Sequence, residues 1–504
     1  MQEQIKSNRW VNYIGEAVAL VFTGLFVLAL QPHLTVDFWY DEVMSLEEFI
    51  LVPISKTLTD YSAPNNHIFF NLLMNSWCKL WGINTFAQAA NNVFIVRLLP
   101  LFFTLTTILY VYLTGKKYFS KGNAFISVII LLATIPFYNF AAQVRGYGLS
   151  MMLCSMLLYY GLWFYSTPKV KYGIIVSLLT AFLLYTIPSN LYAILSTILV
   201  LSFIVLGQWE KYDIRLAVKF NAARLILWLM AGIGLGIVLY LPVGEQVVNN
   251  EYVQSEGLFR WKMWNDAVSF YKLLYNWEIW ILILLAVGIV LAIRQKKTRN
   301  NLLPFIGLLF FPFFIAFVQG ANPFDRTFLW VIPVFSLTLG SIVASIFTIK
   351  SKPIISVTVK IIASILLLLQ ITSVCMSQIY WGRLSVYYFL GEEIKAQTIK
   401  YNYYLSYYHP NKKLDDFKRE YYADSIPVFL HEVDKYAMHG YLPIHGINWE
   451  PNTDMIAAVD RYFVITAFED MAIANFQQYD STFEFHRISG DIDFVNIIEA
   501  DRIK

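Results

Sequence analysis

Long apolar blocks, separated by shorter polar connections, recur along most of the chain. Each block runs for roughly 17 to 24 residues with almost no charge, which is the length that an α-helix needs to cross a bilayer. The pattern therefore predicts an all-α polytopic membrane protein with about eleven transmembrane helices. The predicted spans cover residues 13–30, 93–114, 122–139, 146–165, 172–187, 190–207, 224–242, 277–293, 302–318, 327–348 and 354–376.

Two parts of the chain depart from this pattern. Residues 31–92 form a long polar connection after the first span, and residues 67–81 inside it are apolar enough to suggest a further helix. From residue 381 onward the composition becomes polar and charged, with short stretches typical of strands. We therefore predict a transmembrane domain over residues 1–380 and a small extracytoplasmic α/β module over residues 381–504. The elements expected in the module are a helix over Tyr387–Ile399, a strand at Phe463–Ile465 and a hairpin that joins Phe483–Ile488 to Phe494–Ile498 through Ser489-Gly490-Asp491.

The distribution of lysine and arginine predicts the orientation of these helices. Basic residues gather in alternate connections, which the positive-inside rule places in the cytoplasm. The N-terminus is then cytoplasmic, whereas residues 31–92 and the C-terminal module are extracytoplasmic. Because a crossing by residues 67–81 would invert every later connection, we interpret them as an interfacial helix on the outer face. The basic residues concerned are Lys6, Arg9, Lys116, Lys117, Lys121, Lys169, Lys171, Lys211, Arg215, Lys219, Arg224, Arg294, Lys296, Lys297, Arg299, Lys350 and Lys352.

Composition excludes several other classes of protein. The chain is 57% hydrophobic and only 14% charged, with a mean hydropathy of +0.52, whereas soluble domains carry about 25% charged residues. A net charge of +3, without a basic tract or an RNA-binding aromatic motif, argues against a nucleic-acid partner. The three cysteines, Cys78, Cys154 and Cys375, match neither a disulfide framework nor a metal-ligand spacing. The first span has no small-residue cleavage site, so we expect a retained anchor.

Acidic, amide and arginine side chains gather on the predicted outer face. Trp39 and Tyr40 are residue types that settle at the level of lipid headgroups, which places Asp41 and Glu42 at the membrane surface. Nucleotide sugars are cytoplasmic, so a reaction on this face needs a donor that arrives through the membrane, such as a sugar on a polyprenyl phosphate. A carboxylate can take the proton of an acceptor hydroxyl, and arginine suits the departing lipid phosphate. The residues that provide these groups are Asp41, Glu42, Asn65, Asn66, His67, Arg97, Arg145, Tyr147, Asp325 and Arg326.

Four short motifs follow one another on this face: Tyr40-Asp41-Glu42, Pro64-Asn65-Asn66-His67, Arg97-Leu98-Leu99-Pro100 and Arg145-Gly146-Tyr147-Gly148-Leu149. Together they resemble the GT-C superfamily of integral-membrane glycosyltransferases. The resemblance is to the branch of protein O-mannosyltransferases and the lipid A aminoarabinose transferase, of glycosyltransferase family 39 type, and it covers most of residues 10–350. Many relatives have Pro-Pro-Leu-Tyr at the second motif, and the form found here is similar to a variant in bacterial members.

The resemblance implies a GT-C fold and the transfer of a sugar from a polyprenyl-phosphate donor to a hydroxyl group of a lipid, glycan or protein. It implies a single displacement with inversion, in the inner membrane of a bacterium. It carries over no metal ligands, and a divalent cation stays open as a cofactor. The residue roles it implies are a catalytic base at Asp41 with Glu42 beside it, donor-phosphate binding by Arg145, Arg326 and Arg97, and substrate binding by Asn66, His67 and Tyr147.

Structural roles remain open for the same side chains, and the module offers two further patterns. Glu47 and Glu48 fit a solvated helix face. Asp41 could be the N-cap of a helix over Val43–Val52, and His67 could anchor the interfacial helix by hydrogen bonding. Arg97 could snorkel or pin the loop, and Asp325 and Arg326 could form an ion pair. In the module, the spacing of His431, Glu432, Asp434, His439 and His445 fits no metal-ligand pattern, and the Asp-x-Asp motif at Asp491-Ile492-Asp493 lies in an expected turn.

Two other functions compete with glycosyl transfer. One is a transporter or flippase of lipid-linked saccharides, which is disfavoured because the polar residues gather at one edge of the spans and not at the midplane. The other is an inactive relative that serves as a binding or assembly subunit, against which the Asp41-Glu42 pair argues only weakly.

Overall fold

The computed structural model describes residues 16–17, 19–206, 214–250, 259–274, 277, 279–320, 323, 325–348, 353–384, 410–431, 435–451, 453–466, 469–488 and 496–503. The chain forms two compact units, which are described separately. Unit 1 comprises Met1–Gln31, Ile54–Leu73 and Arg97–Tyr380, and unit 2 comprises Pro32–Pro53, Met74–Val96 and Trp381–Lys504. Two stretches of the first polar connection therefore belong to the same unit as the C-terminal residues, and the boundary drawn at residue 380 stays a prediction.

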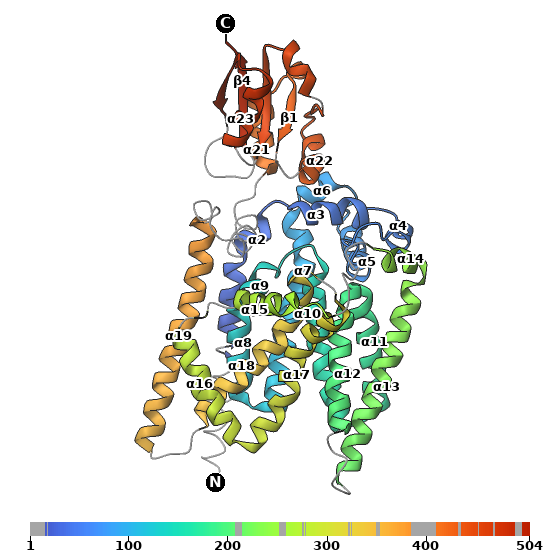
Figure 1. Cartoon of the computed structure of the whole chain (residues 1–504), viewed down its shortest axis with the longest axis vertical. Coiled ribbons are helices and arrows are strands. Elements are labelled where there is room, and N and C mark those ends of the chain that lie inside the picture. Colours follow the sequence, from blue (N-terminus) through green and yellow to red (C-terminus); the bar gives the residue numbers. More distant parts are fainter. Residues whose placement is uncertain are drawn as a thin grey trace. The chain divides into compact units, whose positions relative to one another are not determined.

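Unit 1 consists of helices, most of which run roughly along one direction (Figure 1). The helices that lie wholly or mainly in it are α4 (Ile54–Thr59), α7 (Val93–Thr114), η2 (Gly115–Phe119), α8 (Lys121–Leu132), α9 (Ile135–Asn139), α10 (Gly146–Ser166), α11 (Val170–Thr186), η3 (Pro188–Asn190), α12 (Leu191–Leu206), α13 (Ile214–Tyr240), η4 (Leu241–Val243), α14 (Gly244–Val248), α15 (Lys262–Leu274), α16 (Ile279–Arg294), α17 (Lys296–Gln319), η6 (Asp325–Phe328), α18 (Val331–Phe347) and α19 (Pro353–Leu384). Helix α5 (Ile68–Leu80) continues from unit 1 into unit 2.

Close packing between neighbouring helices holds unit 1 together. Helix α11 packs against α10 and α13, α8 against α18, and α12 against α17. A Cβ atom on Gly340 of α18 would overlap Ser127 of α8, and one on Gly232 of α13 would lie 2.5 Å from Thr180 Cβ of α11. Because helices in a bilayer gain little hydrophobic energy from mutual contact, small residues stabilise such pairs by allowing close van der Waals packing.

The described helices agree with the predicted spans. Five of them are long and apolar enough to cross a membrane by length and composition: Val93–Phe119, Gly146–Ser166, Pro188–Leu206, Phe220–Val248 and Thr298–Gln319. The shorter apolar helices found in the described residues are Ala19–Ala29, Lys121–Leu132, Val170–Thr186, Ile279–Arg294, Val331–Phe347 and Ser356–Gln370, and each overlaps a predicted span. The helical membrane architecture is confirmed, whereas the count of eleven crossings stays a prediction.

Helix α5 covers most of the segment that we interpret as interfacial. Its 13 residues extend for only about 20 Å at the usual rise of an α-helix, whereas the hydrocarbon core of a bilayer is about 30 Å thick. The helix alone would not cross that core, in line with an interfacial position, which stays a prediction.

Unit 2 joins helices of the first connection to a four-stranded sheet. The early elements are α2 (Gln31–Thr35), α3 (Tyr40–Ser45), the π-helix η1 (Leu46–Ile50) and α6 (Phe86–Ala90). The C-terminal elements are α21 (Pro410–Glu420), β1 (Val428–His431), α22 (Lys435–Ile444), η7 (Thr453–Ala458), β2 (Arg461–Thr466), α23 (Glu469–Tyr479), β3 (Phe483–Arg487) and β4 (Asn496–Arg502). The strand order is β1-β2-β4-β3, in which β1 is parallel to β2 and the other two pairs are antiparallel.

The sheet confirms the α/β character of the C-terminal part. Strand β2 contains the predicted strand, and β3 pairs with β4 as the predicted hairpin requires, with Phe483 opposite Arg502. The aromatic side chains of Phe429, Tyr462 and Phe476 pack with their neighbours to form one buried core. The predicted helix over Tyr387–Ile399 and the expected turn with its Asp-x-Asp motif lie outside the described residues.

Candidate functional site

Asp41 and Glu42 lie in the first turn of α3 and are almost fully buried. The helix begins at Tyr40, and the residue in the N-cap position is Trp39. The backbone N–H of Trp39 donates a hydrogen bond to Glu42 Oε2 (3.3 Å), as a glutamate at the third position of a helix commonly accepts. The interpretation of Asp41 as the N-cap is therefore wrong, because Asp41 stands inside the helix and Glu42 performs the capping.

Contacts within unit 2 fix the position of α3. Asp37 Oδ2 accepts a hydrogen bond from the backbone N–H of Asn411 (2.8 Å) at the start of α21. The hydroxyl of Tyr441 on α22 donates to the carbonyl of Phe38 (3.0 Å), and both side chains are buried. The Tyr441 ring also packs edge-on against Phe86, with 5.2 Å between ring centroids. The segment that leads into α3 is therefore bound to residues 374 and 403 positions later in the sequence.

A second group of the predicted residues meets in unit 1 around Arg145. Arg145 stands in the N-cap position of α10 and is 2% exposed. Its Nη2 donates to Asn65 Oδ1 (3.2 Å), and its guanidinium carbon lies 5.6 Å from the centroid of the Tyr147 ring. The amide and the aromatic ring hold the positive charge of Arg145 in a fixed position. The N–H groups in the first turn of the helix add partial positive charge at the same place.

His67 closes the same cluster as a hydrogen-bond acceptor. The backbone N–H of Gly146 donates to His67 Nδ1 (2.9 Å), and the imidazole packs edge-on against Tyr147. Burial and the positive charges of Arg145 and Arg326 hold the pKa of His67 well below its ordinary value. The ring is therefore neutral, with its proton on Nε2. The hydrogen bond from Gly146 supports the interpretation of His67 as an anchor.

Asn66 holds the loop before α5 in place. Its Nδ2 donates to the carbonyls of Thr57 (2.9 Å) and Asp60 (2.6 Å), and its Oδ1 accepts from Asn71 Nδ2 (2.9 Å). The side chain is fully buried, so these contacts favour a positioning role over substrate contact. The amide that contacts Arg145 belongs to Asn65. The sequence alone does not show which of two adjacent asparagines makes this contact.

The structure adds to this cluster Tyr61, which belongs to none of the four sequence motifs. Tyr61 is buried, and burial together with Tyr147 raises its pKa, which Arg145 partly offsets. Its backbone N–H donates to Gln246 Oε1 in the middle of α14, and Gln246 Nε2 donates to the carbonyl of Thr59 (3.0 Å). A tyrosine in a polar loop carries no spacing signal, so only the fold could identify it.

The two remaining predicted arginines lie on separate elements. Arg97 is fully buried in the second turn of α7, which does not support a snorkelling side chain, and its pinning of the loop stays a prediction. Arg326 lies in η6 and is partly exposed, and its charge acts on His67. The side chain of Asp325 lies outside the described residues, so an ion pair with Arg326 stays a prediction.

Other polar residues have simpler surroundings. Glu47 and Glu48 are partly exposed, and burial, followed by the charge of Glu48, raises the pKa of Glu47. Three histidines of the proposed metal cluster have different neighbours: His431 lies against Asn475 and Thr466, His439 against Trp449, and His445 against Asn411. Among the described residues, no group of three His, Cys, Asp or Glu side chains is arranged to hold a metal ion.

We expect Gly146→Ala to destabilise the Arg145 cluster, because a Cβ at position 146 would lie 2.9 Å from both Cβ and Nδ1 of the buried His67. Overpacking of this kind costs about 1–3 kcal/mol, which thermal unfolding in detergent would measure. Gly148→Ala is the matched control on the same helix, since its Cβ would meet Phe140 O at an ordinary 3.8 Å. Equal unfolding midpoints for the two variants would contradict the predicted clash.

We expect stability to fall in acid because of His67. The folded-state pKa is depressed below the ordinary 6.5, so below pH 6.5 the unfolded chain binds a proton that the folded chain resists. This lowers the free energy of unfolding by up to about 1.4 kcal/mol per pH unit, until the folded-state pKa is reached. His67→Asn keeps an acceptor for Gly146 but does not titrate. Thermal unfolding of both proteins between pH 7.5 and 5 should show a smaller acid loss in the variant, and identical slopes would contradict the role of His67.

Comparison of the sequence with models of protein families and with curated proteins gives no match. Among solved structures, the chain is similar to apo ArnT from Cupriavidus metallidurans, with 12% identity, 99% of each chain covered and a TM-score of 0.50. ArnT from the same organism bound to undecaprenyl phosphate gives 13% identity, 97% and 98% coverage of this chain and that chain, and a TM-score of 0.47. The apo oligosaccharyltransferase from Archaeoglobus fulgidus gives 12% identity, 84% and 64% coverage, and a TM-score of 0.45.

The similarity to ArnT, over nearly the whole of both chains, establishes the fold. The protein is an integral membrane protein with the GT-C fold, and that prediction from the sequence motifs is confirmed. The particular residue roles inside the fold remain predictions.

Proposed function

We propose that the protein is a glycosyltransferase that moves a sugar from a polyprenyl-phosphate donor to an acceptor hydroxyl at the extracytoplasmic membrane face. The observation that carries the proposal is the Arg145 cluster: a buried arginine at the N-terminus of α10, oriented by Asn65 and beside a neutral His67. This arrangement suits a phosphate that gains charge as its bond to the sugar breaks. The GT-C fold supports the same class of reaction.

In the proposed reaction, the acceptor oxygen attacks the anomeric carbon as the bond from that carbon to the phosphate oxygen breaks. The acceptor proton passes to Asp41, and the electron pair of the broken bond leaves with the polyprenyl phosphate. Arg145, with Arg326 and Arg97, provides positive charge for that leaving group. A single displacement of this kind inverts the configuration at the anomeric carbon. The loop over residues 31–92 then carries the reacting carboxylate.

Donors of this kind are lipids, which accounts for a reaction site outside the cytoplasm. We propose the orientation that the positive-inside rule gives, with the N-terminus in the cytoplasm and the C-terminal module outside, in a bacterial inner membrane. The acceptor is a hydroxyl group of a lipid, glycan or protein.

Incubation of the purified protein with polyprenyl-phosphate sugars and candidate acceptors tests the proposal. We expect release of polyprenyl phosphate together with a glycosylated acceptor. A flippase would instead move a labelled lipid-linked sugar across proteoliposomes without cleaving it, and an inactive binding subunit would do neither. Translocation without cleavage, for any donor that binds, would overturn the proposed function.

A further inference from the structure

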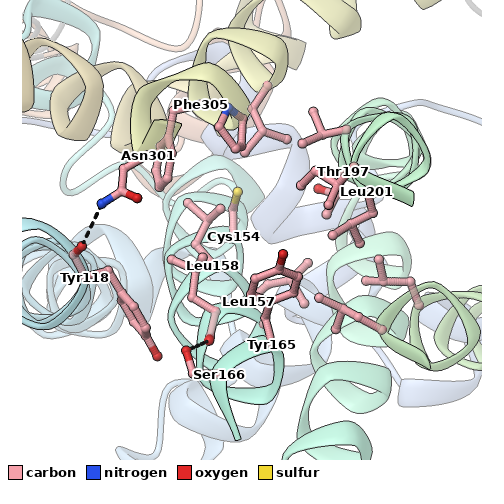
Figure 2. A pocket seen from close by; sticks show the side chains of 18 of the residues that line it. Tyr118, Cys154, Leu157, Leu158, Tyr165, Ser166, Thr197, Leu201, Asn301 and Phe305 are labelled. Atoms are coloured by element: carbon pink, nitrogen blue, oxygen red, sulfur yellow. Dashed lines mark hydrogen bonds between the residues drawn. The ribbon is translucent and has the colours of Figure 1, made fainter. Parts of the chain in front are cut away.

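Unit 1 contains a cavity of about 480 Å³ that lies away from the Arg145 cluster. Its wall is mostly apolar and comes from α10, α12, α13, α17 and η2 (Figure 2). In Figure 2, Cys154 and Leu157 of α10 and Thr197 and Leu201 of α12 line the same space. The volume falls within the range of roughly 300–1,000 Å³ that is usual for ligand pockets.

On α10 and α17 the cavity lies toward the end of the helix that adjoins a basic connection. It is lined from Cys154 to Ser166, the last residue of α10, whereas Arg145 precedes the first residue of that helix. At the rise of an α-helix, 21 residues extend for roughly 30 Å. A ligand whose polar group lies beside Ser166 is therefore far from the proposed donor phosphate.

Three cations from three elements are sequence neighbours of residues that line the cavity. Each is exposed and directly precedes a lining residue: Lys117 comes before Tyr118, Arg224 before Leu225, and Arg299 before Asn300. Lys117 Nζ also lies 3.0 Å from the centroid of the Trp163 ring on α10. Aromatic and basic side chains at one level of a helical bundle are typical of the headgroup region of a bilayer.

We propose that this cavity binds one hydrocarbon chain of an anionic phospholipid, with the phosphate beside Lys117, Arg224 and Arg299, which we call the cationic border. The wall of the cavity is mostly apolar, and an acyl chain is the apolar group that the surrounding leaflet provides. The cationic border accounts for the selection of an anionic headgroup. This site is separate from the donor site and does not depend on the proposed reaction.

Gly161→Leu is designed to fill the cavity. Gly161 lines it, and a Cβ there would meet Leu225 Cδ2 only at 4.0 Å, so the helix accepts the side chain without a backbone clash. Gly234→Leu is the matched control, because Gly234 is exposed on α13 and has no atom within 4 Å of its Cβ position. Thr197→Phe is a second filling variant, from the opposite wall. All three proteins must first elute as single species with the wild-type helical content.

Native mass spectrometry of the full chain, titrated with phosphatidylglycerol, phosphatidylcholine or undecaprenyl phosphate, measures the bound lipid. We expect one retained phosphatidylglycerol, a loss of at least fivefold in a filling variant that passes this folding check, and no loss in Gly234→Leu. Lys117→Gln combined with Arg299→Gln should remove the preference for phosphatidylglycerol over phosphatidylcholine. The proposal would be overturned if Gly161→Leu and Gly234→Leu retained equal amounts of phosphatidylglycerol. It would also be overturned if the wild type retained the two phospholipids equally, or if undecaprenyl phosphate displaced phosphatidylglycerol.

A second inference rests on contacts inside unit 2. Tyr441 binds the backbone of Phe38, Asp37 accepts from Asn411, and α22 packs against α3. A Cβ on Gly440 would lie 2.8 Å from Val43 Cγ1. We infer that the C-terminal module acts as a positioning element for the helix that carries Asp41, an inference whose functional part rests on the proposed role of Asp41.

Hydrogen exchange of the backbone over residues 38–50 tests this inference without an activity assay. We expect Tyr441→Phe to raise exchange in that segment by at least threefold and Gly440→Val to raise it further, whereas Tyr421→Phe, at an exposed tyrosine of the same unit, changes nothing. In turnover, Tyr441→Phe should lower kcat and leave the donor KM unchanged. Unaltered exchange in Tyr441→Phe and in Gly440→Val would overturn the inference. If Asp41→Asn kept wild-type turnover while Tyr441→Phe still altered the exchange, only the proposed function would be overturned.

Discussion

Asp41→Asn should lower kcat by roughly 10²- to 10⁴-fold, the usual contribution of a general base, while the protein remains folded. The asparagine has the shape of the aspartate but cannot take the acceptor proton. Asp41 is 5% exposed and lies in a helix whose cap is provided by other residues, so the substitution removes charge without removing the cap. Steady-state release of polyprenyl phosphate by the purified variant measures the effect.

Two neighbouring glutamates provide the controls for Asp41. Glu48→Gln, in the π-helix that follows, should keep wild-type turnover because this side chain has no proposed role in the reaction. Glu42→Gln keeps an acceptor oxygen for the Trp39 N–H, so any loss of turnover in that folded variant reports on charge and not on capping. Wild-type turnover in Asp41→Asn would remove Asp41 from the role of base, and a selective loss in Glu42→Gln would assign that role to Glu42.

Arg145→Lys should lower kcat/KM for the donor by roughly 10- to 100-fold, equivalent to one or two lost charge-assisted hydrogen bonds. Lysine keeps the positive charge but cannot hold both Asn65 and a phosphate with the planar fork of a guanidinium. Arg145→Ala should be more severe, because it also removes the contact with the Tyr147 ring. Initial rates measured against donor concentration, at saturating acceptor, give the effect.

Arg294→Ala is the control for loss of an arginine, since Arg294 is the exposed last residue of α16. Its donor dependence should match the wild type. Unchanged donor dependence in folded Arg145→Ala would make Arg145 a structural residue, and a loss confined to the acceptor KM would move it to the acceptor side of the reaction.

The membrane helices and the sheet could be predicted because their patterns follow from simple physical constraints. A bilayer demands long apolar helices, so every predicted span overlaps an apolar helix of the structure. Strand β2 lies between β1 and β4 and is buried at five successive positions, which explains why a continuous apolar run identified it. Strand β1 has only four residues and follows Pro427, and so short a stretch carries no periodic signal.

The candidate site was only partly predictable because it depends on tertiary contacts. The motifs identified Arg145 and His67, and the fold places them together with Tyr147. They do not distinguish Asn65, which contacts Arg145, from Asn66, which holds the loop. The sequence predicts a helix that begins at Val43, whereas α3 begins at Tyr40, because a tryptophan in the N-cap position lacks the side-chain signal that Ser, Thr, Asp or Asn would give.

The hydrogen bond from Asn411 to Asp37 spans 374 residues, and the one from Tyr441 to Phe38 spans 403. A ribosome that adds roughly 5–20 residues per second needs about 20–80 s to cover that distance. During translation, the segment before α3 is therefore synthesised well before Asn411 and Tyr441, its hydrogen-bond partners. An incomplete nascent chain that stops before position 411 would lack both restraints, so maturation of this loop is timed by the end of synthesis.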